Sequence, residues 1–131
     1  MAQSGTDRIE RGRAMSQRLN PDATGAMLGA LTAVAPDIEE LVLGGVVADI
    51  WDRDQLSLRE RSIIRLAVIA ALGESESATQ VAIGTAYNIG LSTEDIAEVF
   101  VQTSPQVGII RVLAALEALN RHLDSERATV S

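Results

Sequence analysis

Apolar residues recur at helical spacing along most of the chain, and polar capping residues separate one apolar segment from the next. No segment shows the strict alternation of apolar and polar residues, or the clustering of β-branched residues, that is typical of a strand. The pattern therefore predicts an all-α fold, a compact bundle of six or seven helices. The expected helices cover approximately residues 7–19, 21–34, 36–51, 58–72, 77–88, 93–103 and 105–123.

Capping motifs mark the start of several expected helices. Ser77 and Gln80 have the spacing of a capping box, in which two side chains satisfy backbone N–H groups that the first turn leaves free. Ser92 is expected to cap the next helix, and Ser104 followed by Pro105 is typical of an N-cap and a first helical residue. We therefore expect the last helix to begin at this pair as a separate element.

One expected helix is apolar on almost every side. Residues 63–72 contain a single charged residue, Arg65. Such a helix lies either at the centre of a bundle or under another subunit, and a small domain can hardly surround it completely, so we expect a homo-oligomer. The pair Gly44 and Gly45 would also permit two backbones to approach closely, which is equally compatible with tight packing within one chain.

The length of 131 residues suits one domain with one core. We predict a single helical domain over residues 1–131, with an ordered core at 8–123 and a polar, frayed tail at 124–131. Apolar residues make up 47% of the chain but aromatic residues only 2%, so we expect the core to consist of Ala, Leu, Ile and Val side chains.

Composition excludes several kinds of chemistry. The chain has no cysteine, which excludes disulfides, thiolate nucleophiles and thiol redox reactions, and no lysine, which excludes Schiff-base chemistry. One histidine without cysteine cannot build a zinc site, and no Gly-x-Gly-x-x-Gly or phosphate-binding loop occurs. We therefore expect neither a cofactor nor a metal.

Charge and hydropathy limit the partners. The formal net charge of -7 repels the phosphates of nucleic acids. Residues 82–100 have the spacing of a helix-turn-helix, but its second helix would present Glu94, Asp95 and Glu98 to those phosphates. No basic segment followed by an apolar one opens the chain, and the apolar stretch 63–72 is too short to span a bilayer. We expect a cytoplasmic protein that binds neither nucleic acids nor membranes.

Two stretches carry a resemblance to a known family. Residues 50–62, IWDRDQLSLRERS, resemble the motif Trp-x-Arg-x-x-Leu-Ser-x-x-Asp/Glu-Arg-Ser of the carboxymuconolactone decarboxylase family. Residues 86–99, AYNIGLSTEDIAEV, are similar to its segment Ala-x-x-x-Gly-x-Thr-x-Glu-Glu-Ile-x-Glu-Val. The resemblance extends over roughly residues 8–123 and implies the helical fold of this family and of the related alkyl hydroperoxidase D-like proteins. With this fold we expect a homo-oligomer that is a trimer or a hexamer.

The chain also departs from the pattern of that family. The histidine that active decarboxylases carry in the fifth helix falls at Ala82, which cannot transfer a proton. The family's tyrosine falls at Gln106 and its later proline at Ile110, while a proline stands instead at Pro105. The Cys-x-x-Cys pair of the hydroperoxidase D-like proteins is absent. The resemblance therefore implies the fold more directly than the reaction.

Arg65 and Arg61 are the candidate catalytic residues. A guanidinium in an apolar helix keeps its proton and needs a carboxylate or an anionic ligand to offset its desolvation. Arg61 precedes Arg65 by one turn on the same face, so the two could clamp a carboxylate or an enolate. Alternatively, both pair with acidic residues such as Glu94 or Glu98 in a purely structural contact.

Aromatic, amide and imidazole side chains supply the other candidates. The tryptophan and tyrosine rings could line a binding site for a flat apolar ligand, or they could anchor the core. Three glutamine amides could orient a carbonyl group of a ligand, or they could simply lie exposed on the surface. His122, the only histidine, could act as a base, but near the expected end of the last helix it is more typical of an interaction with the helix dipole. The candidates for substrate binding are Trp51, Gln80, Tyr87, Gln102 and Gln106.

These features favour a small-molecule enzyme. We expect a cofactor-independent lyase, isomerase or cyclase that acts on a cyclic carboxylate, a lactone or a polyketide-like molecule in an apolar pocket. Arg61 and Arg65 would stabilise negative charge that develops in a reaction other than carboxymuconolactone decarboxylation. The alternative is a non-catalytic oligomeric binding or scaffold protein that keeps the family fold. A cavity on the order of several hundred Å³ would favour the enzyme.

Overall fold

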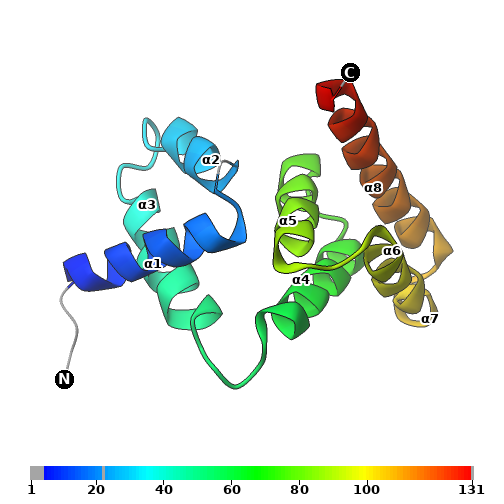
Figure 1. The fold of residues 1–131 in the computed structure, drawn as a ribbon, viewed down its shortest axis with the longest axis horizontal. Helices are drawn as coiled ribbons and strands as arrows, with labels where there is room; N and C mark the ends of the chain where they lie inside the picture. The colour runs from blue at the N-terminus through cyan, green and yellow to red at the C-terminus, as the bar shows by residue number, and fades with distance from the viewer. Residues whose placement is uncertain (1–4, 22, 131) are drawn as a thin grey trace. The chain divides into compact units, whose positions relative to one another are not determined.

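The computed structural model describes residues 5–21 and 23–130, and all regular secondary structure within them is helical (Figure 1). This confirms the predicted all-α fold. Every helix in this part of the chain is too short or too polar to cross a membrane. The elements are α1 (Gly5–Leu19), α2 (Ala23–Leu31), α3 (Ile38–Glu40), η1 (Leu41–Trp51), α4 (Leu58–Leu72), α5 (Glu76–Ile89), α6 (Thr93–Gln102), α7 (Ser104–Val107) and α8 (Ile109–Val130).

The chain divides into two compact units, Met1–Leu58 and Arg59–Ser131. The segment 52–57 before α4 is largely polar and forms no helix. The main hydrophobic core lies wholly in the C-terminal unit, so none of its buried residues comes from α1, α2, α3 or η1.

The N-terminal unit depends on a close crossing of α1 and η1. A Cβ atom placed on Gly12 would lie 1.8 Å from the carbonyl oxygen of Leu43, so only glycine fits there. Around this crossing, Arg8 pairs with Asp49, Arg11 pairs with Asp52 and Arg13 pairs with Glu39. Within the chain, a Cβ on Gly44 would meet only the Arg8 side chain, at 4.0 Å, and a Cβ on Gly45 would meet no atom within 4 Å.

The expected helix over residues 36–51 has two parts. A short α-helical turn, α3, continues directly into η1, which is a π-helix. In a π-helix each backbone N–H bonds to the carbonyl five residues earlier, whereas in an α-helix it bonds to the carbonyl four residues earlier. The spacing of apolar residues in the sequence does not distinguish these two hydrogen-bond patterns. Leu43, Val47 and Ala48 of η1 are buried, so the element still presents one apolar face within its unit.

Small and branched apolar side chains fill the core of the C-terminal unit. Phe100, the only phenylalanine, is the largest fully buried side chain and is 0% exposed. The alanines allow α5 and α8 to pack closely. The core consists of Leu66, Ala70, Ala82, Ile83, Ala86, Leu91, Ile96, Phe100, Ala115, Ala118 and Leu119.

The caps of α5 and α6 differ in how well the sequence predicts them. The Ser92 hydroxyl accepts the N–H of Asp95 while the Asp95 carboxylate accepts the N–H of Ser92, so the predicted cap of α6 is confirmed. The predicted capping box of Ser77 and Gln80 is wrong. Ser75 caps α5 instead, accepting the N–H of Ala78 at 3.2 Å.

The last predicted helix is interrupted and also longer than expected. Gly108, at a φ of 87°, separates α7 from α8. The tail expected to fray at 124–131 is helical as far as Val130, so that expectation is wrong. Arg127 pairs with Asp124 at 3.0 Å within this last part of α8, which extends the helix past the point where apolar periodicity ends.

Candidate functional site

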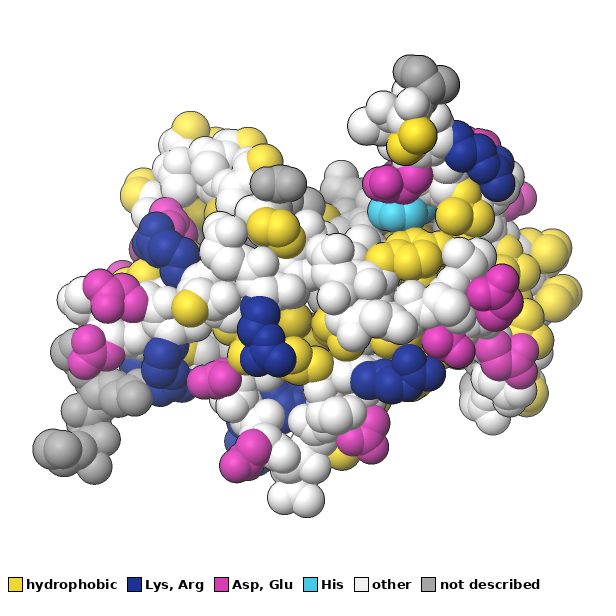
Figure 2. All heavy atoms as spheres, in the orientation of Figure 1, with side chains coloured by type: hydrophobic (Ala, Val, Ile, Leu, Met, Phe, Trp, Pro, Cys, Tyr) yellow, Lys and Arg dark blue, Asp and Glu magenta, His cyan; other side chains and the backbone are white. Residues whose placement is uncertain are grey.

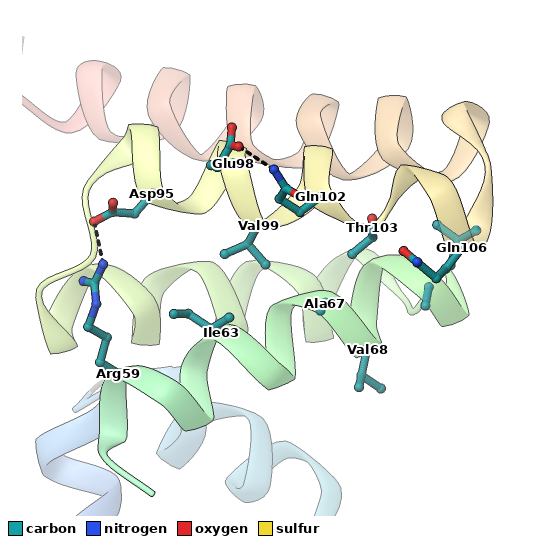
Figure 3. Close-up of a pocket in the computed structure, with 12 residues that line it drawn as sticks. Arg59, Ile63, Ala67, Val68, Asp95, Glu98, Val99, Gln102, Thr103 and Gln106 are labelled. Carbon is teal, nitrogen blue, oxygen red and sulfur yellow. Dashed lines mark hydrogen bonds and ion pairs between the residues drawn. The ribbon is translucent and has the colours of Figure 1, made fainter.

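A groove of about 640 Å³ lies between α4 on one side and α6 and α7 on the other, within the C-terminal unit (Figure 3). Most of its surface is apolar. The apolar lining comprises Ile63, Ala67, Val68, Ala71, Val99 and Val107, and the polar lining comprises Arg59, Asp95, Glu98, Gln102, Thr103 and Gln106. The volume lies in the range typical of small-molecule sites.

Helical spacing explains why these residues meet. Arg59, Ile63 and Ala67 follow one another at intervals of four along α4, so they form one stripe that faces the groove. On α6, Glu98 and Gln102 share a face by the same spacing. The groove is therefore apolar along α4 and carries its amides and carboxylates along α6 and α7.

An ion pair closes one end of the groove. Arg59 lies 3.4 Å from Asp95, which also accepts the backbone N–H of Ser92 (Figure 3). The pKa of Asp95 lies below its usual range, chiefly because of the backbone hydrogen bond from Ser92, with smaller contributions from the Ser92 side chain and from Arg59. Asp95 is thus a charged cap near neutral pH and is unsuited to proton transfer there.

The carboxylate of Glu98 also lies in the groove, and a glutamine side chain rather than a backbone N–H group holds it. Gln102 Nε2 donates to Glu98 Oε1 at 2.8 Å, and neither group caps a helix (Figure 3). Thr103, farther along the groove, donates its hydroxyl proton to the Phe100 carbonyl at 2.6 Å, so its donor is occupied. Gln106 lines the groove beyond it, which leaves Glu98, Gln102 and Gln106 as the groups that could contact a polar ligand.

Arg61 and Arg65, the predicted catalytic residues, are not among the residues that line this groove. They follow Arg59 on α4 by two and six residues, which separates them from it by about 160° and 120° around the helix axis. Arg65 is half-buried, and this burial lowers the pKa of its guanidinium. Of the three arginines Arg59, Arg61 and Arg65, only Arg59 lines the groove.

Gln80 and Tyr87, both predicted to bind substrate, lie together at the contact of α5 with α8. Each touches His122: Gln80 Oε1 is 3.1 Å from His122 Nδ1, and the two rings stack with centroids 5.3 Å apart. The Tyr87 hydroxyl is 2.6 Å from that of Thr93. Neither Gln80 nor Tyr87 lines the groove.

The expected position of His122 at a helix C-terminus is wrong. α8 continues to Val130, about two turns beyond it, so the imidazole does not face the end of the helix dipole. Trp51, the remaining predicted ligand contact, is the last residue of η1 in the N-terminal unit and is half-buried. It is not part of the groove lining.

Sequence analysis did not single out Arg59 or Glu98 as site residues. Glu98 precedes Gln102 by four residues, and this spacing could have indicated a glutamine that orients a carboxylate. Ala82, where the resemblance places a histidine, is 1% exposed within the core. Over residues 5–21 and 23–130, no three His, Cys, Asp or Glu side chains are grouped closely enough to hold a metal ion.

Comparison with known families agrees with this architecture. Residues 36–121, well over half of the chain, match the model of the Carboxymuconolactone decarboxylase family. The matched segment includes α4, α5, α6 and α7, and therefore every residue of the groove lining. No curated protein matches the chain.

Proposed function

The chain belongs to the carboxymuconolactone decarboxylase family, and on that premise we propose that it is a cofactor-independent enzyme of the lyase, isomerase or cyclase type. Its substrate is a cyclic carboxylate, a lactone or a polyketide-like small molecule. The observation that carries this proposal is the groove of about 640 Å³, which offers apolar walls to a flat ring and a few polar groups along one side.

The roles follow from what each polar group can do. Glu98 acts as the proton acceptor, because its carboxylate lies in the groove and Gln102 holds it at 2.8 Å. Gln106 orients the substrate carbonyl or carboxylate through its amide. Arg59, at the end of the groove, stabilises negative charge that develops on the substrate, although it shares its guanidinium with Asp95.

Carboxymuconolactone decarboxylation itself is not the proposed reaction. The position of the family histidine is an alanine that is 1% exposed among core side chains, and nothing there can exchange a proton with a ligand. A reaction that depends mainly on the shape of the groove and the orientation of the substrate needs less acid–base machinery.

The second candidate is a non-catalytic, oligomeric binding or scaffold protein. It is favoured by an apolar stripe on α4, in which Ile64, Val68 and Leu72 are 50%, 47% and 62% exposed. These residues recur at intervals of four, and a contiguous apolar surface of this kind typically marks a contact with another protein. Under this proposal a second copy of the chain, within a trimer or a hexamer, covers the stripe, and the groove catalyses no reaction.

Ligand binding is the first test. We expect 2-naphthoate, a flat apolar carboxylate, to raise the unfolding temperature in a concentration-dependent way, equivalent to about 2.7 kcal/mol at a hundredfold excess over Kd. Ala67→Phe fills the groove and should abolish this effect. The matched control is Ala114→Phe, an exposed alanine of α8 outside the groove lining, which should leave binding intact.

Turnover separates the two candidates. A panel of cyclic keto acids and lactone carboxylates is followed by proton NMR, and Glu98→Gln should reduce the rate for an accepted substrate by about 100-fold or more. Arg59→Ala and Arg65→Ala are compared in parallel, because only the first lies in the groove. Loss of turnover in Arg65→Ala alone would reject the groove as the catalytic site, and binding without turnover of any compound would favour the scaffold.

A further inference from the structure

His122 is the only histidine of the chain, and the proposed groove does not use it. It lies on α8, where its side chain is 17% exposed and its ring is stacked on Tyr87 with an interplanar angle of 15°. Figure 2 shows part of this side chain, in cyan, at the surface of the face that is drawn. The ring is therefore fixed in orientation and partly accessible.

Gln80 determines which nitrogen of this ring carries the proton. Gln80 Nε2 lies 3.0 Å from Glu76 Oε1 and 2.8 Å from the carbonyl oxygen of Ala118. A carbonyl and a carboxylate only accept hydrogen bonds, so the amide must present its nitrogen to them and its oxygen to His122. Gln80 Oε1, 3.1 Å from His122 Nδ1, then requires an N–H at Nδ1.

The acceptor that orients Gln80 is itself held in its ionised form. Arg121 donates to both carboxylate oxygens of Glu76, at 2.9 and 2.8 Å. The hydrogen bonds from Arg121 and from Gln80 lower the pKa of Glu76 below its usual range. Glu76 is consequently a carboxylate at neutral pH, and a chain of contacts from Arg121 through Glu76 and Gln80 fixes the proton on His122 Nδ1.

The other ring nitrogen is left as a lone pair. Among the described residues, the nearest ionic partner of His122 Nε2 is Glu126 Oε1, at 3.9 Å, which is too long for a hydrogen bond. Glu126 is 68% exposed and would stabilise the ring once it is protonated. An imidazole with its Nδ1 proton held and its Nε2 lone pair free has the arrangement of a general base.

We propose that His122 is a second reaction site of this chain, separate from the groove, which activates water toward small activated esters. Nε2 takes a proton from a water molecule, and the water oxygen forms a bond to the ester carbonyl carbon. The bond from that carbon to the leaving oxygen then breaks with its electron pair, and the leaving oxygen takes the proton from Nε2. Gln80 is a positioning residue, because it acts through the ring.

The tautomer is tested on the unmodified chain by nitrogen-15 NMR. Because there is one histidine, its ring signals need no assignment. In the neutral form we expect Nδ1 to resonate as a protonated nitrogen and Nε2 as an unprotonated one. Gln80→Leu should shift the equilibrium toward the Nε2–H form. A parent spectrum that already shows a proton on Nε2 would overturn the proposal, whatever the variants do.

Reactivity is tested with 4-nitrophenyl acetate as the probe. We expect the rate of ester hydrolysis to fall by about tenfold or more in His122→Asn and by about threefold in Gln80→Leu. Thr129→Ala, an exposed residue of α8 that does not line the groove, should leave this rate unchanged. An unchanged rate in a folded His122→Asn protein rejects this site and leaves the groove proposal standing.

Discussion

Gly12 of α1 and Leu43 of η1 meet backbone to backbone, so closely that a Cβ on the glycine would lie 1.8 Å from the leucine carbonyl oxygen. Backbone atoms cannot move aside as the end of a flexible side chain can. The crossing of the two longest helices of the N-terminal unit therefore depends on the absence of one methyl group.

Gly12→Ala is expected to destabilise the N-terminal unit by about 2 kcal/mol or more, because the helices must separate to admit the new atom. Hydrogen exchange at the amides of α1 and η1 would show this as lost protection. Gly45→Ala is the matched control, since its Cβ meets no atom within 4 Å and alanine favours a helix. Equal effects of the two substitutions would contradict the observed crossing.

Asp95 should make the protein sensitive to acid. Its pKa is lowered in the folded chain, so the unfolded chain binds a proton more readily. The contribution of Asp95 to stability is then fully present above the ordinary carboxyl pKa and is lost as the pH falls below that value and through the lower pKa of the folded chain. Asp95→Asn should show a smaller fall in the free energy of unfolding over this acidic range.

Denaturant titrations at a series of pH values would measure this difference. Asp54→Asn, in the helix-free segment 52–57, serves as the control and should follow the pH dependence of the parent chain. If Asp95→Asn were as acid-sensitive as the parent, the cap and the contact with Arg59 would contribute nothing to stability.

The interruption between α7 and α8 at Gly108 depends on a backbone conformation that residues other than glycine rarely adopt. Its φ of 87° ends α7 and allows α8 to start in a new direction, and a Cβ there would meet no atom within 4 Å. Gly108→Ala should therefore cost about 1 kcal/mol through backbone strain alone, without a steric clash. Thermal unfolding of this variant beside Gly25→Ala, whose φ is not positive, would isolate the conformational cost.

Local signals in the sequence were sufficient for several elements. α4 has the predicted bounds of Leu58 and Leu72, and Ser92 caps α6 as expected, because a helix and its cap are determined by residues close together in the chain. The cap of α5 was predicted two residues too late, at Ser77, which lies in the first turn of the helix that Ser75 caps. The predicted partner of Ser77 was Gln80, which in the structure bonds to Ala118 on another helix.

The arginine that reaches the groove could not have been identified from the sequence. Most of α4 is apolar on nearly every side, so its sequence pattern does not indicate which face of the helix packs against α6. Arg65 appeared exceptional because its neighbours are apolar, whereas Arg59 lies in a polar stretch beside Glu60 and Arg61. Only the packing of α4 against α6, a contact between distant segments, turns Arg59 toward Asp95.

Thr85 and Ser62 bury hydroxyl oxygens that find no hydrogen-bond partner among the described residues, and each residue is 1% exposed. A buried polar atom without a partner costs free energy that an apolar group of the same shape does not. We therefore expect Thr85→Val, which keeps the shape of the side chain, to be neutral or to stabilise the chain by up to about 1 kcal/mol. Thr79→Val is the comparison, because the Thr79 hydroxyl donates to the Ser75 carbonyl at 2.9 Å and its removal should be less favourable. Equilibrium unfolding in urea would measure both changes, and a loss of stability in Thr85→Val larger than that in Thr79→Val would show that the Thr85 hydroxyl is satisfied in solution.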